Sequence, residues 1–206
     1  MQIRSLLTTF CLAVLSSTLH AATWEGPFGL QKGLTAEEMS AATKGWKRVE
    51  PYVYVFESAP ASYGGVSEYV AVVTPQTGLC EVTGAFQIDN ASAYGDDVKK
   101  LVARLTEGLT QKYGEPARSF DFLRAGSVWT QPSDWHMSLY KKERVRSVFW
   151  HKGSAPTSPP MPNALSAIAI QAGAEDASSA FVDLTYQFDN YDACLAIRNQ
   201  SDDAAL

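Results

Sequence analysis

The sequence predicts an α+β fold: an antiparallel sheet with one long amphipathic helix, residues 96–113, packed on it, and short helices near both ends. Apolar residues recur at spacings of three and four through residues 96–113, and short strand-like segments lie before and after that helix. These segments follow one another through short turns, and the helices interrupt runs of strands. Such an order favours antiparallel pairing.

The first short helix is predicted from the stretch FGLQKGLTAEEM, residues 28–39. Thr35 and Glu38 have the spacing of a capping box, in which each side chain accepts a hydrogen bond from the other residue's backbone N–H. Leu34 and Met39 flank this cap at the positions of a hydrophobic staple. The stretch is therefore interpreted as a helix start and not as a ligand-binding loop.

Strands are predicted where β-branched and aromatic residues gather or alternate with polar ones. They are expected at residues 52–56, 69–73, 80–88, 167–172 and 181–188, and a hairpin is expected at residues 135–150. Simple alternation in residues 80–88 places Cys80 on the same buried face as Val82, Phe86 and Ile88. The long helix ends at Gly114, and a short helical segment is expected around Cys194.

The N-terminal residues have the layout of a secretory signal peptide. Arg4 precedes an apolar run about half as long as the roughly 20 residues that span a membrane, and small residues follow it up to Ala21. Cleavage is expected after Ala21 or Ala22. The prediction is therefore a periplasmic or secreted protein in which residues 22–206 form a single domain, with a Pro-rich loop at 153–163.

Export changes the interpretation of the cysteines. Cys11 would leave with the signal peptide, so the mature chain keeps Cys80 and Cys194 alone. In an oxidising compartment such a pair is best explained as one disulfide. Two buried free thiols and a metal pair are the alternatives, and zinc needs about four ligands at short spacings.

The charge balance bears on partners. The signal peptide carries Arg4 and no acidic residue, so 16 Lys and Arg face 22 Asp and Glu in the mature chain, a net charge of −6. An acidic chain argues against a nucleic-acid partner, because phosphate contacts need a basic surface. No segment after the signal peptide is apolar and long enough to be expected to span the membrane.

The candidate binding site lies in the predicted hairpin. Residues 129–152 hold five basic against two acidic residues, whereas residues 164–206 hold seven acidic residues against Arg198 alone. Aromatic rings beside cations suit a glycan or a protein partner. The competing interpretation is a hairpin whose aromatic rings enter the core. The residues proposed for binding are Trp135, Tyr140, Lys142, Arg144, Arg146 and Trp150.

No familiar catalytic, cofactor-binding or metal-binding motif occurs in the sequence. The mature chain has two histidines, His136 and His151, without metal-ligand spacing, and it lacks nucleophile-elbow and phosphate-loop patterns. No cofactor and no metal are therefore expected. Carboxylates assembled by the fold leave no signature in a sequence, so a hydrolase stays open as an alternative.

One resemblance adds to this. Gly33-Leu34-Thr35-x-x-Glu38, which leads from a helix into strands, resembles the repeat unit of small exported α+β proteins. These include the small lipoproteins of outer-membrane assembly and the β-lactamase inhibitor protein. The resemblance implies a binding or assembly role, although this chain lacks a lipidation cysteine at the cleavage site. The leading hypothesis is a non-enzymatic binding or accessory protein whose partner is an envelope protein or a glycan. A protein inhibitor or envelope-assembly factor is the first alternative.

Overall fold

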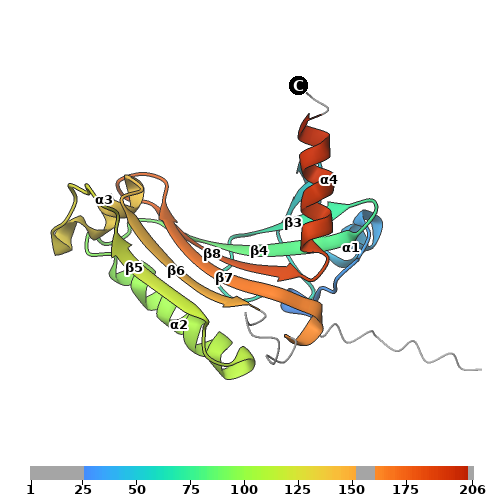
Figure 1. Ribbon diagram of the computed structural model, residues 1–206, viewed down its shortest axis with the longest axis horizontal. Coiled ribbons are helices and arrows are strands. Elements are labelled where there is room, and N and C mark those ends of the chain that lie inside the picture. The colour runs from blue at the N-terminus through green and yellow to red at the C-terminus, as the bar shows by residue number, and fades with distance from the viewer. Residues whose placement is uncertain (1–25, 152–160, 204–206) are drawn as a thin grey trace, which may run out of the picture.

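The computed structural model describes residues 26–151 and 161–203, which form one eight-stranded antiparallel sheet with helices on both faces (Figure 1). The strand order is β1-β2-β3-β4-β8-β7-β6-β5. The strands are β1 (Lys47–Glu50), β2 (Val53–Phe56), β3 (Glu68–Thr74), β4 (Gly78–Ile88), β5 (Arg118–Leu123), β6 (Arg144–His151), β7 (Leu165–Ala174) and β8 (Ala180–Phe188). The predicted fold class is confirmed.

The helices divide the chain into two similar halves. Helix α1 (Ala36–Ala42) precedes β1 to β4, and α2 (Asp96–Tyr113) precedes β5 to β8. Each set of four strands is contiguous in the sheet, and the two sets meet where β4 pairs with β8. The order of one helix followed by four strands therefore occurs twice. The second half also contains α3 (Trp135–Tyr140), and α4 (Tyr191–Asp203) ends the described chain.

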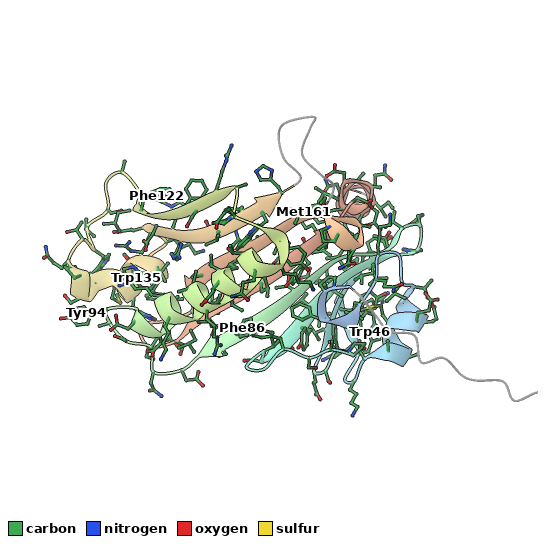
Figure 2. The ribbon with its side chains drawn as sticks, turned by 90° about the horizontal axis from the view of Figure 1, so that it is seen from below. Trp46, Phe86, Tyr94, Phe122, Trp135 and Met161 are labelled. Atoms are coloured by element: carbon green, nitrogen blue, oxygen red, sulfur yellow. A yellow bond between two sulfur atoms is a disulfide. The ribbon has the colours of Figure 1, made fainter. Side chains whose placement is uncertain are left out.

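Helix α2 has the predicted bounds and covers one face of the sheet (Figure 2). Its buried stripe, Val98, Val102, Leu105 and Leu109, packs toward β7 and β8. On β8 every second residue from Ala180 to Phe188 is buried, as the two-residue period of a strand requires. The residues between them point to the opposite face, called the open face here.

Helix α1 begins as predicted. The backbone N–H of Glu38 donates to Thr35 Oγ1 at 3.2 Å, and the N–H of Thr35 donates to Glu38 Oε2 at 2.8 Å. Leu34 and Met39 are both buried in the core. The capping box thus accounts for residues 35–38 as the start of a helix.

Helix α4 stands on the open face near β3 and β4, at the far end of the sheet from α3 (Figure 1). A disulfide joins Cys194 of α4 to Cys80 of β4, with Cα atoms 6.3 Å apart. The predicted placement of Cys80 with Val82 was wrong. Val72 pairs with Glu81 and Val73 pairs with Leu79, so Cys80 is the extra residue of a β-bulge and packs with Val72 and Cys194 beneath α4.

The predicted hairpin at 135–150 was also wrong in its first half. Residues 135–140 are helix α3, which follows a short 3-10 turn at Pro132–Asp134, and only β6 is a strand. Two strands, β1 and β5, were not predicted. The signal peptide, most of the 153–163 loop and the chain end at 204–206 lie outside the described residues. No helix in the described ranges is long and apolar enough to cross a membrane.

Candidate functional site

The two tryptophans proposed for binding belong to the core. Trp135 and Trp150 are 4% and 3% exposed. Trp150 donates from Nε1 to the carbonyl oxygen of Gly114 at 2.8 Å, just beyond α2. Trp135 lies beside the opposite end of α2, where its ring fills the space that a side chain at Gly95 would need (Figure 2). Neither ring offers a face to a ligand, so the proposal of Trp135 and Trp150 as binding residues was wrong.

The remaining predicted residues lie near one another but differ in their contacts. Arg144 forms an ion pair with Asp121 of β5 and donates from Nε to Ser138 Oγ at 3.0 Å. Arg146 donates from Nη1 to the carbonyl oxygen of Phe120 at 3.1 Å. Tyr140 has the Lys141 ammonium 4.5 Å from its ring centroid. Arg144 is therefore a structural residue, and Tyr140 is engaged with a neighbouring cation.

A hollow of about 460 Å³ lies at the end of the sheet near α3, and basic residues are among those that line it. Arg146 and Ala172 are the last paired residues of β6 and β7 at this end, and the hollow opens where the two strands part beyond them. We call it the cationic hollow. Its basic lining residues are Arg124, Lys142, Arg144 and Arg146.

Only Arg144 of these four basic residues forms an ion pair with a described residue. Within the described ranges, Arg124, Lys142 and Arg146 form no ion pair, and no Asp or Glu lines the hollow. Arg124 donates from Nε to the carbonyl oxygen of Lys142 at 3.1 Å, which holds the two residues together. Guanidinium groups bind carboxylates and phosphates through paired hydrogen bonds, so this arrangement suits an anionic group.

A second hollow of about 510 Å³ lies beside the first on the open face. Glu68 of β3, Glu175 after β7 and Asp183 of β8 line it, and no Lys or Arg does. Burial raises the pKa of the Asp183 carboxyl to about 6. We call it the acidic hollow, and its charge is opposite to that of its neighbour.

Phe181 separates the two hollows and lines both. It pairs with Gln87 of β4 and with Gly173 of β7. A Cβ atom on Gly173 would come within 2.3 Å of Phe181 Cζ, so the ring lies over the backbone of Gly173. Glycine inside a strand often marks such a close approach. We call Phe181 with its two flanking hollows the bipolar surface.

The turn between β7 and β8 shapes the acidic side of the bipolar surface. Buried His136 of α3 donates from Nε2 to the carbonyl oxygen of Asp176 at 2.8 Å, next to Glu175. The Asp176 carboxylate accepts from the backbone N–H groups of Ser178 and Ser179, and these hydrogen bonds lower the pKa of Asp176. His136 thus anchors the turn that carries Glu175. In the described part of the chain, no group of three or more His, Cys, Asp or Glu is placed to hold a metal.

A further aromatic group lies on the open face near the cationic hollow. The rings of Phe120 and Phe122 of β5 are 6.0 Å apart, and Phe120 is 6.1 Å from the ring of Phe149 of β6. Phe122 is 46% exposed. It lies on the strand at one border of the sheet (Figure 2). The exposed ring of this group, Phe122, therefore comes from β5 and not from the predicted hairpin.

Sequence reasoning named Lys142, Arg144 and Arg146 of the bipolar surface but missed Phe181, Arg124 and the acidic lining residues, because these come from other segments of the chain. Glu68, Asp183 and Arg124 meet only through the pairing of β3, β4, β8, β7 and β6. Gly173 lies inside β7 but just beyond the strand predicted at 167–172, so the sequence did not mark it as a glycine within a strand.

Comparison with protein-family models, with curated proteins and with solved structures finds no match to this chain.

Proposed function

We propose that this protein is an exported, non-enzymatic binding protein that docks a protein partner on its bipolar surface. The observation that carries the proposal is that two hollows of opposite charge share one wall, Phe181. A partner with an acidic group for Arg124 and Lys142 and a basic group for Glu175 would match both. Complementary charges of this kind give a protein interface its orientation and specificity.

The two charges favour a protein over a glycan. An anionic glycan would be attracted by the cationic hollow but repelled by the carboxylates beside it. A neutral sugar would gain little from three unpaired cations. A protein surface carries groups of both signs a few ångströms apart, so it can satisfy both hollows at once.

Phe181 has the position of an interface anchor. Binding energy is usually concentrated in a few central aromatic and arginine residues with polar groups around them. Here the ring lies between charged hollows, and the Phe120, Phe122 and Phe149 group extends the apolar area along β5 and β6. A stable interface buries about 800 Å² on each partner, and the adjoining strands supply a continuous surface for it.

Two further observations support the proposal. Each half of the sheet follows a helix, α1 or α2, which gives the chain two parts of similar order. The Cys80–Cys194 disulfide is compatible with export. The intact mass of the protein purified from its native host tests the export step: a chain that begins at Ala22 or Thr23 is expected, and one that retains residues 1–21 would contradict it.

Charge reversal of the cationic hollow tests docking. Arg124→Glu with Lys142→Glu changes two exposed side chains and leaves Arg144 paired with Asp121. In affinity purification from envelope extract with quantitative mass spectrometry, the partner should be recovered at least tenfold less than with the wild-type chain, because like charges at an interface cost several kcal/mol. Recovery should also fall with salt in the wild type.

The matched control is Lys44→Glu with Arg48→Glu, which reverses one Lys and one Arg that are also exposed, near and on the edge strand β1. This variant should recover the same partner as the wild type. Equal loss in both double variants would contradict docking at the bipolar surface. Recovery that depends on a glycan, and disappears after glycosidase treatment of the extract, would also contradict it.

A hydrolase is the second candidate, favoured by one observation. Burial raises the pKa of Asp183 to about 6, and two further carboxylates line the same hollow. A carboxyl group that titrates near neutral pH can act as a general acid. If the protein hydrolyses p-nitrophenyl glycosides or esters, Asp183→Asn should abolish the activity and Glu57→Gln, which changes an exposed glutamate away from the hollow, should not. Activity that survives Asp183→Asn would exclude this site.

A further inference from the structure

A separate apolar cavity of about 330 Å³ lies on the other side of the sheet, beside α2. Its volume falls within the range of about 300–1,000 Å³ that small-molecule sites have. One wall is α2, the floor is β8, and the opposite wall consists of residues 26–29 and 61–63. The lining side chains are mostly apolar and include Phe28, Leu105, Leu109 and Leu184.

The wall at residues 26–29 is held rigidly in an unusual conformation. Phe28 has φ of 54° and Gly29 has φ of 75°, both in the left-handed region. The ring of Phe28 packs edge-on against Tyr69 and Tyr186, at 5.0 and 5.4 Å between centroids. The N–H of Ala61 donates to the carbonyl oxygen of Phe28 at 2.9 Å and joins the two segments of this wall. These contacts hold the wall in place on the side of the cavity opposite α2, so the space between them stays open.

Gly108 of α2 lines the cavity from the helix side and is exposed. A Cβ at this position would meet no atom within 4 Å, so no close packing requires glycine there. Glycine is among the least favourable residues inside a helix. A side chain at position 108 would stand at the entrance to the cavity. A glycine at this position therefore keeps the entrance open to a ligand.

Two hydrogen-bond donors stand out on the cavity lining. Tyr186 lines the cavity and is 7% exposed. The hydroxyl of the neighbouring Tyr113 is buried and makes no hydrogen bond with the residues that the structure describes. Burial, with the neighbouring Tyr113 and Tyr63, raises the pKa of Tyr186, so its hydroxyl stays protonated and able to donate. Lys112 is exposed and places its ammonium 5.2 Å from the ring centroid of Tyr113.

We infer that this cavity is a binding site for a small apolar molecule that carries a carboxylate. The apolar part lies among Leu105, Leu109 and Leu184, and the carboxylate accepts hydrogen bonds from Tyr186 and Lys112. An apolar pocket with a few converging polar groups is the usual design of such sites. The inference does not depend on the bipolar surface, which lies on the opposite face of the sheet.

Titration of the mature protein with decanoate, followed by calorimetry, tests the inference. Saturable binding at one site is expected, with acetate failing to bind and decanol binding at least fivefold more weakly because it lacks the charge. Gly108→Trp should reduce decanoate affinity at least tenfold, because the indole lies across the entrance. Gly108→Ala is the matched control and should bind as the wild type does.

Lys112→Gln measures how much the carboxylate of decanoate contributes to the affinity, apart from the contribution of the apolar chain. It should bring the affinities for decanoate and decanol within twofold of each other while leaving decanol binding unchanged. The inference would be overturned by the absence of saturable decanoate binding, or by Gly108→Trp binding as tightly as Gly108→Ala. Thermal unfolding of both Gly108 variants establishes that each is folded.

Discussion

The ring of Phe181 lies over the backbone of Gly173 on the neighbouring strand, where no residue with a side chain would leave room for it. The two residues are registered partners in the β7–β8 pairing. This relationship fixes the ring between the cationic and acidic hollows and makes it the centre of the bipolar surface.

Gly173→Ala should destabilise the protein by about 1–3 kcal/mol, because the new methyl group displaces the Phe181 ring. The same change made in a Phe181→Ala background should cost less than about 0.5 kcal/mol, since the ring is no longer there. Urea unfolding of the four chains gives the coupling between the two positions. Costs that simply add would show that the ring does not lie on Gly173.

Asp183→Asn should stabilise the protein at pH 8 but not near pH 3.5. Burial raises the pKa of this carboxyl from 3.8 to about 6, so the folded state loses stability as the group ionises between these two values. A shift of two units corresponds to roughly 3 kcal/mol, and partial solvent screening reduces the expected gain to about 1–2 kcal/mol.

Unfolding free energies of the wild-type and Asp183→Asn chains across this pH range measure the effect. Glu57→Gln, an exposed change away from the hollow, should show no such pH-dependent difference. A difference between Asp183→Asn and wild type that is the same at pH 3.5 and pH 8 would contradict the raised pKa. The ionised Asp183 carboxylate lowers the stability of the fold, which is consistent with a role for its charge in the function of the acidic hollow.

The disulfide should contribute about 3–5 kcal/mol, because it closes a loop with a sequence separation of 114 and holds α4 to the sheet. Cys80→Ser with Cys194→Ser should lower the unfolding free energy by this amount. Reductant should destabilise the wild type and leave the double variant unchanged. Labelling of the folded mature protein with a thiol reagent should find no free thiol, and two reactive thiols would contradict both the bond and the proposed export.

The parts of the fold that could be predicted were those in which apolar residues recur at regular spacings. Helix α2 could be placed to the residue because its stripe repeats over five turns and a glycine ends it. The six residues 135–140 are too few to distinguish a helix from a strand. Trp135, Met137 and Leu139 alternate as in a strand, whereas Trp135 and Leu139 also have the spacing of one face of a helix. Strand β1 was not predicted because all four of its residues are exposed. Its sequence therefore shows no alternation of apolar and polar residues.

The orientation of Cys80 shows a further limit. The alternation of buried and exposed residues breaks down at a bulge. Nothing in the sequence of residues 78–82 shows that the pairing with β3 shifts by one residue there.

The candidate site also depends on how the strands pair, which the local sequence does not show. Lys142, Arg144 and Arg146 line one hollow and could be grouped because they are neighbours in sequence. Phe181 lines the same hollow, and Asp183 the adjacent one, only through the order of the strands.

Site-specific photo-cross-linking from position 181 is the most direct measurement of the central claim. With p-benzoylphenylalanine in place of Phe181, irradiation in the native host should give a discrete covalent adduct with one envelope protein. The same group at Val49, an exposed position on edge strand β1, should not. The absence of a protein adduct at position 181, or the same adduct from both positions, would contradict docking at the bipolar surface.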